Sequence, residues 1–361
     1  MIMNKRIKSF EEGFGTAYTF IIILFASIIF IGLAYLIINS RNHISFDSNI
    51  ESEVLSQDIA EQIINSMLED NTPESDSLID PVWALVSSLN TETVAITLTD
   101  LSSRINPNFF RDEIVDETNI SKLIFADGHS MAELEQYRSD NTITADLQNG
   151  YPEFFSEDGI EFYLSSYSYF NINIADELAL TDMYVIRTEN ESASESFRSK
   201  IRQSRTNKTI IYNNEIENIA GSAAGKIYPF INAVPVMNIH LIPEELLSEI
   251  LSYDFGDDKL KYPEKSFNQI IQKRTNGEIG IDELESIFSV KDEKHLIFDY
   301  LGTKTWFWEI TISLDDCKRT VIVAELPDKE YSYKPRDAAS KGNIKRTLQI
   351  ISNLFYNEQD L

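Results

Sequence analysis

The sequence predicts an α+β protein in which a long N-terminal helix carries a mixed domain. Residues 1–72 contain no proline, and their apolar residues recur with a helical period. Segments rich in Val, Ile and Thr, which favour strands, lie at 93–99 and again within 306–326. The sequence between these segments is mostly helical. We therefore expect one α/β domain that is interrupted by a large helical insertion.

The N-terminal helix begins with a predicted membrane span. The run 20–39 contains no charged residue and is long enough to cross the ~30 Å hydrocarbon core of a bilayer. Lys5, Arg6 and Lys8 precede the run, whereas acidic residues dominate after it. The positive-inside rule then places the N-terminus in the cytoplasm and most of the chain across the membrane. A cleaved secretory signal peptide is the alternative, but no Ala-x-Ala site follows the run.

Beyond the span, the helical period continues to about residue 68. The apolar stripe of this second half comprises Ile50, Val54, Ile59, Ile63 and Met67. Acidic residues lie between the members of the stripe, which makes this half of the helix amphipathic. The stripe therefore needs a globular surface to cover it, and we expect the domain to pack there.

Composition and motifs argue against several functional classes. The formal net charge of −27 disfavours nucleic-acid binding, which depends on Lys and Arg neutralising phosphate. Cys317 is the single cysteine, so it is expected to be a structural thiol without an intrachain disulfide. The 4 histidines are scattered, and the sequence contains no Gly-rich phosphate loop, G-x-S-x-G or H-E-x-x-H motif. We expect no catalytic residue and no enzymatic activity.

Two acidic clusters offer carboxylate oxygens, the ligands that the hard cation Ca²⁺ takes in proteins. The first cluster comprises Asp254, Asp257 and Asp258. The second cluster comprises Glu309, Asp315 and Asp316. Calcium is the one cofactor that these residues suggest. In a chain with 58 acidic residues, a solvated loop is the alternative interpretation of each cluster.

Three helices are predicted near the end of the insertion, over 244–252, 266–274 and 281–288. Pro243 opens the first of them at a favoured first-turn position. The dipeptide 276–277 (Asn-Gly) follows the second helix and provides its stop signal. These helices are therefore short and separated by tight connections.

This region resembles a helix-hairpin-helix or SAM-like unit. The earlier segment 172–178 (INIADEL) echoes its start at 238–246, so we expect two diverged helical units. Such units contact DNA through glycine amides and lysines at the phosphates. The joint at 253–258 has one glycine beside its aspartates, which repel phosphate, so a DNA-receptor function is disfavoured.

Two further segments receive local predictions. Residues 189–196 are polar and are predicted to form a loop. In the C-terminal tail, apolar residues recur at helical spacing and predict a short amphipathic helix. These residues are Ile344, Leu348, Ile351 and Phe355.

The arrangement of a basic leader, a glycine junction, an apolar half-helix and an amphipathic half-helix with a domain resembles type IV pilins and pseudopilins. The resemblance implies that a prepilin peptidase cleaves between Gly13 and Phe14 and that the new N-terminus is methylated; Gly15/Thr16 is the second candidate junction. Most members carry glutamate five residues into the mature chain, where this sequence has Tyr18. The missing glutamate is typical of the large K-type minor pseudopilin of type II secretion systems.

Three segments extend the resemblance to the K-type protein along the chain. Residues 94–108 are similar to its V-x-I-x-D-E-x-(G/S)-(K/R)-I-N-x-N strand and turn. Residues 235–247 resemble its V-N-V-N segment, and 306–313 with 320–326 occupy the place of its terminal β-hairpin. Order and spacing carry this resemblance more than any single motif does.

The resemblance implies a domain organisation. Its parts are a leader (1–13), an N-terminal helix (14–72), a pilin-like α/β domain (73–110 and 293–330), a helical insertion (111–292) and a tail (331–361).

It also implies a function without catalysis, which is assembly at or near the tip of a type II secretion pseudopilus during protein export. The implied location is the bacterial inner membrane, with one span and a periplasmic domain. The implied partners are other minor pseudopilins, the inner-membrane secretion platform and prepilin peptidase, and some K-type relatives hold calcium. Two alternatives remain, a minor or tip pilin of a type IV pilus and a membrane-anchored periplasmic sensor or binding receptor.

Overall fold

The computed structural model of the 361-residue chain describes residues 50–70, 75–139, 151–207, 211–254, 260–290, 295–314, 317–327 and 346–357. The expected leader, its cleavage junction Gly13/Phe14 and the expected membrane span at 20–39 lie outside the described residues. Within these ranges, no helix is long and apolar enough to cross a membrane.

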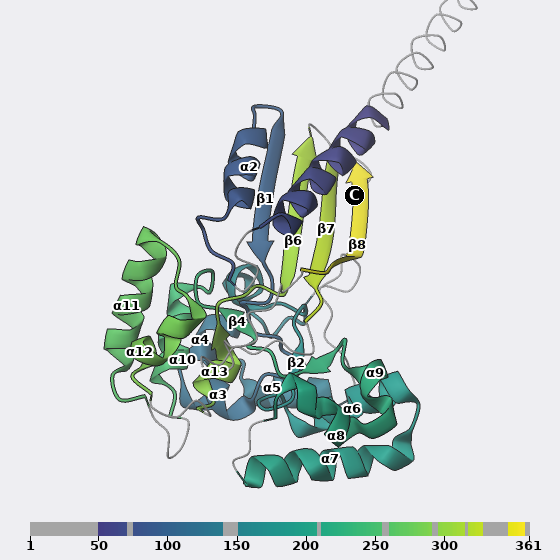
Figure 1. Cartoon of the computed structure of the whole chain (residues 1–361), viewed down its shortest axis with the longest axis vertical. Helices are drawn as coiled ribbons and strands as arrows, with labels where there is room; N and C mark the ends of the chain where they lie inside the picture. Colours follow the sequence, from purple (N-terminus) through teal and green to yellow (C-terminus); the bar gives the residue numbers. More distant parts are fainter. Residues whose placement is uncertain are drawn as a thin grey trace, which may run out of the picture.

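The N-terminal helix, described over 50–68, lies across one face of an antiparallel sheet (Figure 1). The sheet has four strands in the order β1-β6-β7-β8. Their bounds are β1 Val94–Asp100, β6 Phe307–Leu314, β7 Cys317–Glu325 and β8 Leu348–Asn357. The described residues therefore form a mixed α+β structure.

Strands β1 and β6 are distant in the sequence but pair over their whole length. Val94 lies opposite Leu314, and Asp100 lies opposite Trp308. Successive side chains of a strand alternate between the two faces of a sheet, so one face collects the apolar residues. The two predicted strand regions thus share one sheet, and a mostly helical segment connects them. The exact boundaries of the insertion, placed at residues 111 and 292 from the sequence, remain predictions.

The N-terminal helix covers the apolar face of the sheet. Ile59, Ile63 and Met67 are buried against this face, where Trp308 and Ile310 are also buried. Helix α2 (Pro81–Leu89) completes the cluster with two buried valines. Full burial of each large apolar side chain contributes about 1.5–3 kcal/mol, so this contact fixes the helix on the sheet.

The predicted stripe is wrong for its first two members. Ile50 and Val54 are 44% and 56% exposed, so the described part of the domain does not cover them.

The insertion packs as two groups of helices beyond the other end of the sheet (Figure 1). One group consists of α6–α9, and the other consists of α3–α5 together with α10–α13. The first six helices are α3 Asp112–Glu117, α4 Ile120–Ile124, α5 Met131–Arg138, α6 Glu177–Thr188, α7 Glu191–Thr206 and α8 Ile216–Ala220. The next five are α9 Ala224–Ile227, α10 Glu244–Ser252, α11 Pro263–Asn276, α12 Leu284–Phe288 and α13 Ile297–Tyr300. Short strands complete the insertion: β2 Phe170–Asn171, β3 Ile231–Asn232, β4 Met237–Asn238 and β5 Leu301–Gly302.

Three helix predictions are confirmed, whereas the loop prediction is wrong. Helix α10 has the predicted bounds, and α11 extends the second predicted helix at both ends. The third predicted helix starts with a 3₁₀ turn and continues as α12. The loop predicted at 189–196 is mostly the start of α7, because Asn190 caps this helix by accepting the backbone N–H of Ala193 at 3.2 Å.

The amphipathic helix predicted in the tail is a strand, β8. This strand pairs antiparallel with β7, and the register shifts where Ile322 faces Ser352 and Val323 faces Ile350. Ile351 is therefore an extra residue in a β-bulge, which breaks the alternation of a regular strand. The apolar residues Leu348, Ile351 and Phe355 recur at a helical spacing in the sequence, and the bulge lets a strand accommodate this spacing.

Each of the two predicted helical units begins with a buried asparagine, and the two asparagine side chains make the same local hydrogen bond. The side-chain Oδ1 of Asn171 accepts the backbone N–H of Asn173 at 2.8 Å. The Oδ1 of Asn238 likewise accepts the N–H of His240 at 3.0 Å. Each asparagine ends a short parallel strand, β2 or β4, and precedes a helix, α6 or α10. The sequence echo between 172–178 and 238–246 therefore has a structural counterpart.

Candidate functional site

The predicted calcium ligands are only partly described. Asp257, Asp258, Asp315 and Asp316 lie outside the described residues. Asp254 follows the end of α10, and Glu309 lies on β6 opposite Thr99 of β1. The expectation of calcium at these two clusters stays a prediction.

The three described histidines have structural surroundings. His240 is buried, and its Nε2 accepts the backbone N–H of Ile279 at 2.7 Å. Burial lowers the pKa of His240 to about 4, so the ring is neutral at pH 7. His129 pairs with Glu133 on the surface, and His295 Nδ1 accepts a backbone N–H at 3.1 Å. Cys317 is buried at the start of β7, as expected for a structural thiol.

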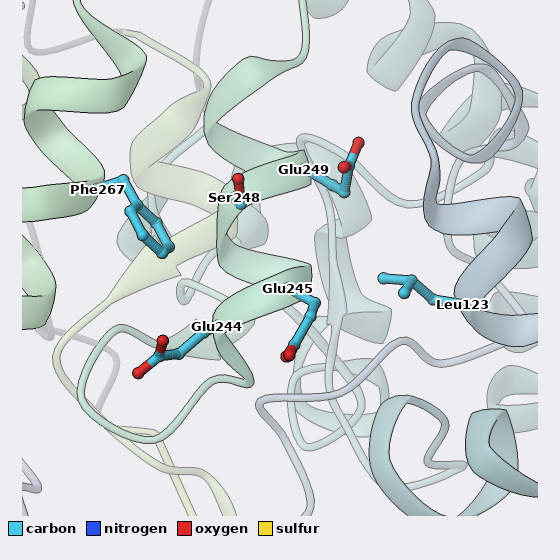
Figure 2. A pocket seen from close by; sticks show the side chains of 6 residues that line it. All are labelled: Leu123, Glu244, Glu245, Ser248, Glu249 and Phe267. Carbon is cyan, nitrogen blue, oxygen red and sulfur yellow. The ribbon is translucent and has the colours of Figure 1, made fainter.

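An acidic pocket of about 410 Å³ lies beside α10 (Figure 2). Its lining residues are Leu123, Glu244, Glu245, Ser248, Glu249 and Phe267. Two of its carboxylates already have partners within the insertion. Glu244 pairs with Arg274 at 3.1 Å, and Glu249 accepts the backbone N–H of Asn119 at 2.9 Å. The remaining polar residues of the lining are Glu245 and Ser248, and the described lining contains no histidine, cysteine or lysine.

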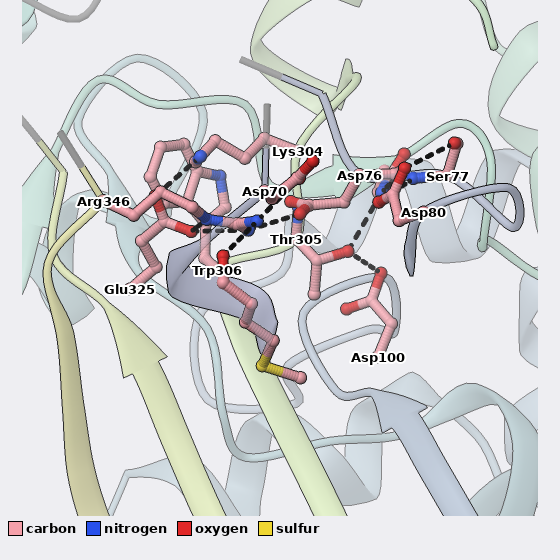
Figure 3. Close-up of polar contacts among 12 residues, drawn as sticks. Asp70, Asp76, Ser77, Asp80, Asp100, Lys304, Thr305, Trp306, Glu325 and Arg346 are labelled. Carbon is pink, nitrogen blue, oxygen red and sulfur yellow. Dashed lines mark hydrogen bonds and ion pairs between the residues drawn. The ribbon is translucent and has the colours of Figure 1, made fainter. Parts of the chain in front are cut away.

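A second feature is a set of buried charged side chains where the helix, the sheet and the insertion meet (Figure 3). We call this set the junction cluster and define it as Asp70, Asp76, Lys304, Glu325 and Arg346. The guanidinium of Arg346 lies 3.0 Å from Asp70 and 2.9 Å from Glu325, and it also pairs with Asp76. Lys304 Nζ lies 2.6 Å from the other oxygen of Glu325. All five side chains are almost fully buried.

Five separate segments bring these charges together. Asp70 follows the N-terminal helix, and Asp76 lies in the connection that leads to α2. Glu325 ends β7, Arg346 precedes β8, and Lys304 lies between β5 and β6. Arg346 Nη1 also donates to the backbone carbonyl of Met67 at 3.2 Å. The junction cluster therefore fixes the end of the N-terminal helix to the last strands of the sheet.

The negative and positive charges of the junction cluster compensate one another. Burial by itself lowers the pKa of Arg346, but attraction to Asp76 and Glu325 outweighs it and raises this pKa overall. Removing one partner of a buried ion pair leaves an uncompensated charge, which is strongly unfavourable. The cluster thus stabilises the fold only while all its members are present.

The network continues from Asp76 into the insertion. Asp76 Oδ2 accepts the backbone N–H of Thr305 at 2.8 Å, and its backbone carbonyl accepts Asn238 Nδ2 at 2.8 Å. Thr305 Oγ1 donates to the buried Asp100 at the end of β1 at 2.9 Å. Burial raises the pKa of Asp100. The asparagine that opens the second helical unit is therefore bonded directly to the junction cluster.

Asp70, Asp76 and Asp80 also have the spacing of a metal site, with one carboxylate oxygen from each within 4.8 Å of the others. Arg346 already pairs with Asp70 and Asp76, so its guanidinium supplies the positive charge there. Asp80 accepts the N–H and the hydroxyl of Ser77 at 2.8 and 2.9 Å. We interpret the group as part of a structural ion network.

The sequence did not point to the junction cluster. Arg346 and Asp70 are 276 positions apart, and neither stands in a motif with a known spacing. The one local signal is that Arg346 lies two residues before β8, a strand without charged residues, so the guanidinium needs a carboxylate from elsewhere in the chain.

The described residues define an α+β protein in which an N-terminal helix packs on an antiparallel sheet, with helices inserted between β1 and β6. No family model and no curated protein match the chain. Among solved structures, it is similar to a chain of the GspK-GspI-GspJ complex from the type 2 secretion system of enterotoxigenic Escherichia coli. That match covers 88% of this chain and 99% of the other, with 10% sequence identity and a TM-score of 0.32.

Proposed function

We propose that this chain is a K-type minor pseudopilin that acts by assembly, without catalysis, at or near the tip of a type II secretion pseudopilus. One observation carries the proposal most directly. The sheet that joins β1 to β6 carries the N-terminal helix, and a large helical insertion lies between these two strands. This is the arrangement that the leader, the apolar run and the Tyr18 position of the sequence imply by their resemblance to that family.

The mechanism follows from the connection between the helix and the domain. The apolar half of the helix resides in the inner membrane and later packs against the helices of sister subunits in the filament. The buried contacts of Ile59, Ile63 and Met67, together with the junction cluster, transmit movement of the helix to the domain. Helix and domain therefore move as one unit when the subunit leaves the membrane.

The position of the insertion supports a place at the tip. The insertion lies beyond the end of the sheet that is opposite to the exposed start of the helix (Figure 1). Subunits that pack along the apolar half-helix meet the domain from that exposed start, whereas the insertion obstructs a subunit above it. The missing glutamate agrees with this, because in the family that carboxylate is thought to pair with the N-terminal amine of a neighbour. A first subunit has no such neighbour to reach.

The proposed partners are other minor pseudopilins and the inner-membrane secretion platform, with prepilin peptidase acting before assembly. The proposed location is the bacterial inner membrane, with the domain in the periplasm. The net charge of −27 supports protein partners over nucleic acid.

The test is complementation of a deletion strain, with secretion of the exported proteins as the readout. The wild type and Ile29→Leu are expected to restore secretion and to co-purify with the smaller pseudopilins encoded nearby. Ile29→Asp is expected to fail in both assays, because a carboxylate at the bilayer centre costs about 2.5–3.5 kcal/mol.

The alternatives give other outcomes in the same strain. Normal secretion with loss of surface fibres in the deletion strain would support a type IV pilus tip. Normal secretion and normal fibres, with a small molecule retained by the purified chain, would support a periplasmic receptor.

A further inference from the structure

Strand β1 is an edge of the sheet whose own sequence lacks the usual protection of an edge. It is the first strand in the order β1-β6-β7-β8, and within the described residues no strand pairs with its outer side. Its seven residues, VAITLTD, include no proline and no charge before the terminal Asp100. Natural edge strands usually carry lysine, other charges or proline, which prevent pairing with another chain. The protection of this edge comes instead from the residues that precede the strand.

The register shows which backbone groups of β1 face the outer side. Alternate residues of a strand direct their N–H and C=O groups to opposite neighbours. Leu101, directly after β1, donates its N–H to the carbonyl of Phe307 at 2.9 Å. Counted back from Leu101, the odd-numbered residues of β1 bond to β6, which pairs with β1 over its whole length. The backbone groups of Val94 and Ile96 therefore face the outer side.

The side chain of Asn90 occupies both outer groups of Ile96. Asn90 Oδ1 accepts the N–H of Ile96 at 2.6 Å, and Asn90 Nδ2 donates to the carbonyl of Ile96 at 3.2 Å. A carboxamide carries both an acceptor and N–H donors, so it reproduces the two bonds that a neighbouring strand makes. Asn90 Nδ2 also donates to the carbonyl of Val86 at 3.1 Å, which fixes the side chain to the last turn of α2.

Thr91 occupies the outer groups of Val94 in the same manner. Its backbone N–H donates to the carbonyl of Val94 at 2.9 Å, and its Oγ1 accepts the N–H of Val94 at 3.1 Å. Helix α2 lies beside β1, and Asn90 is exposed at the end of this helix (Figure 1). The side chain of Asn90 therefore lies between Ile96 and any chain that approaches this part of the edge.

We infer that Asn90 blocks the edge of β1 and prevents another extended chain from pairing there. An incoming strand has to displace both bonds of the Asn90 side chain before it can bond to Ile96. A role limited to the end of α2 requires only the bond to Val86, whereas the two bonds to Ile96 act on the strand. The inference does not rest on the proposed secretion function.

The first test is amide exchange of the purified full chain in detergent, resolved for individual residues of β1. Asn90→Ala removes the acceptor of the Ile96 N–H, so exchange at Ile96 is expected to become about tenfold faster or more. Thr97 N–H faces β6, and its exchange is expected to stay unchanged. Ser88→Ala is the matched control and is expected to change neither rate, because Ser88 is exposed and its hydroxyl bonds to Leu85 within α2.

The second test is association at high salt, measured by light scattering of the same full chain. Salt screens the repulsion that the net charge of −27 creates, so an open edge is free to pair. Asn90→Ala is expected to associate, whereas the wild type and Ser88→Ala are not. Adding Ala95→Lys to Asn90→Ala is expected to reverse the association, because Ala95 is exposed on β1 and lysine at an edge prevents pairing. The lysine does not restore the bonds to Ile96, so this reversal separates edge pairing from a loss of stability.

Several outcomes would overturn the inference. An unchanged exchange rate at Ile96 in Asn90→Ala would do so. Equal increases at Ile96 and Thr97 would also do so, since they would show a general loss of stability. The inference would fail as well if Asn90→Ala scattered light no more than the wild type at high salt, or if the association persisted after Ala95→Lys was added.

Discussion

Arg346, two residues before the start of β8, lies 3.0 Å from Asp70, which is two residues beyond the end of the N-terminal helix. The same guanidinium donates to the carbonyl of Met67, so one side chain joins both ends of the described fold. This contact closes the chain, because the strand nearest the C-terminus and the helix nearest the N-terminus depend on each other.

Replacing Arg346 with Met should destabilise the protein by about 3–5 kcal/mol, since buried carboxylates lose their shared cation. Arg346→Lys should recover only part of this loss, because an ammonium cannot reproduce the fork of a guanidinium. Urea unfolding measures the difference. Arg202→Met is the matched control: Arg202 is exposed and pairs with Glu177 at 2.8 Å, so it should cost at most about 1 kcal/mol. Equal losses for positions 346 and 202 would refute a stabilising role for the cluster.

Asp80 should make the protein more stable as the pH falls. Burial raises the pKa of Asp80 from 3.8 to about 6, so the folded state takes up the proton before the unfolded state does. This contribution is absent above pH 6, grows as the pH falls from 6 to 3.8, and is complete below 3.8. Its size is on the order of 1–3 kcal/mol. Asp80→Asn should remove this slope, and unfolding curves between pH 4 and 7 test it.

His240 should have the opposite effect on stability and make the protein less stable as the pH falls. Burial lowers its pKa from 6.5 to about 4, so the unfolded state binds the proton first. Its contribution is complete above pH 6.5 and is lost as the pH falls towards 4, by about 1.4 kcal/mol per unit. Protonation also breaks the bond from Ile279 N–H. An NMR titration of the ring in the folded protein should show no protonation near pH 6.5, and ordinary titration there would contradict the assignment.

Asn238→Ala should destabilise the protein by about 1–3 kcal/mol, because it leaves buried donors and acceptors without partners. Asn238 donates to the Asp76 carbonyl and to Thr305 Oγ1, at 2.8 and 2.9 Å. Asn276→Ala is the control, since Asn276 is exposed and bonds only within its own helix turn. A loss at position 238 no greater than at 276 would show that the asparagine is dispensable.

Gly13→Ala should slow or block removal of the leader, if the proposed processing by prepilin peptidase is correct. Intact-mass analysis of the wild type should give a mature chain that starts at a methylated Phe14, and the variant should accumulate as the precursor. A mature chain that starts at Thr16 would move the junction to Gly15. A wild type that retains Met1, or is cut near residue 40, would contradict prepilin processing.

The parts of the fold that the sequence predicted are those whose signal is local. Strands β1 and β6 alternate apolar and polar residues. Pro243 lies directly before the first residue of α10 and marks the start of this helix. The strand β8 was missed because its apolar residues do not alternate regularly in the sequence, and the bulge at Ile351 that accommodates this irregularity has no local sequence signal.

The junction cluster was missed for a different reason. An ion pair between residues 276 positions apart leaves no periodic pattern in either segment, since any of many carboxylates satisfies an arginine equally well. The pocket beside α10 depends likewise on the packing of helices that are separate in the sequence.

The pairing of β1 with β6 has a consequence for the order in which the molecule forms during synthesis. The N-terminal helix and β1 leave the ribosome first, but β6 and β7, which complete the surface under Ile59 and Ile63, come after the whole insertion. Contacts between such distant segments form late, because a long loop must close before they can be made. The buried part of the helix, Ile59, Ile63 and Met67, therefore lacks its complete cover until β6 and β7 have been synthesised, and during that time its apolar surface is exposed to aggregation.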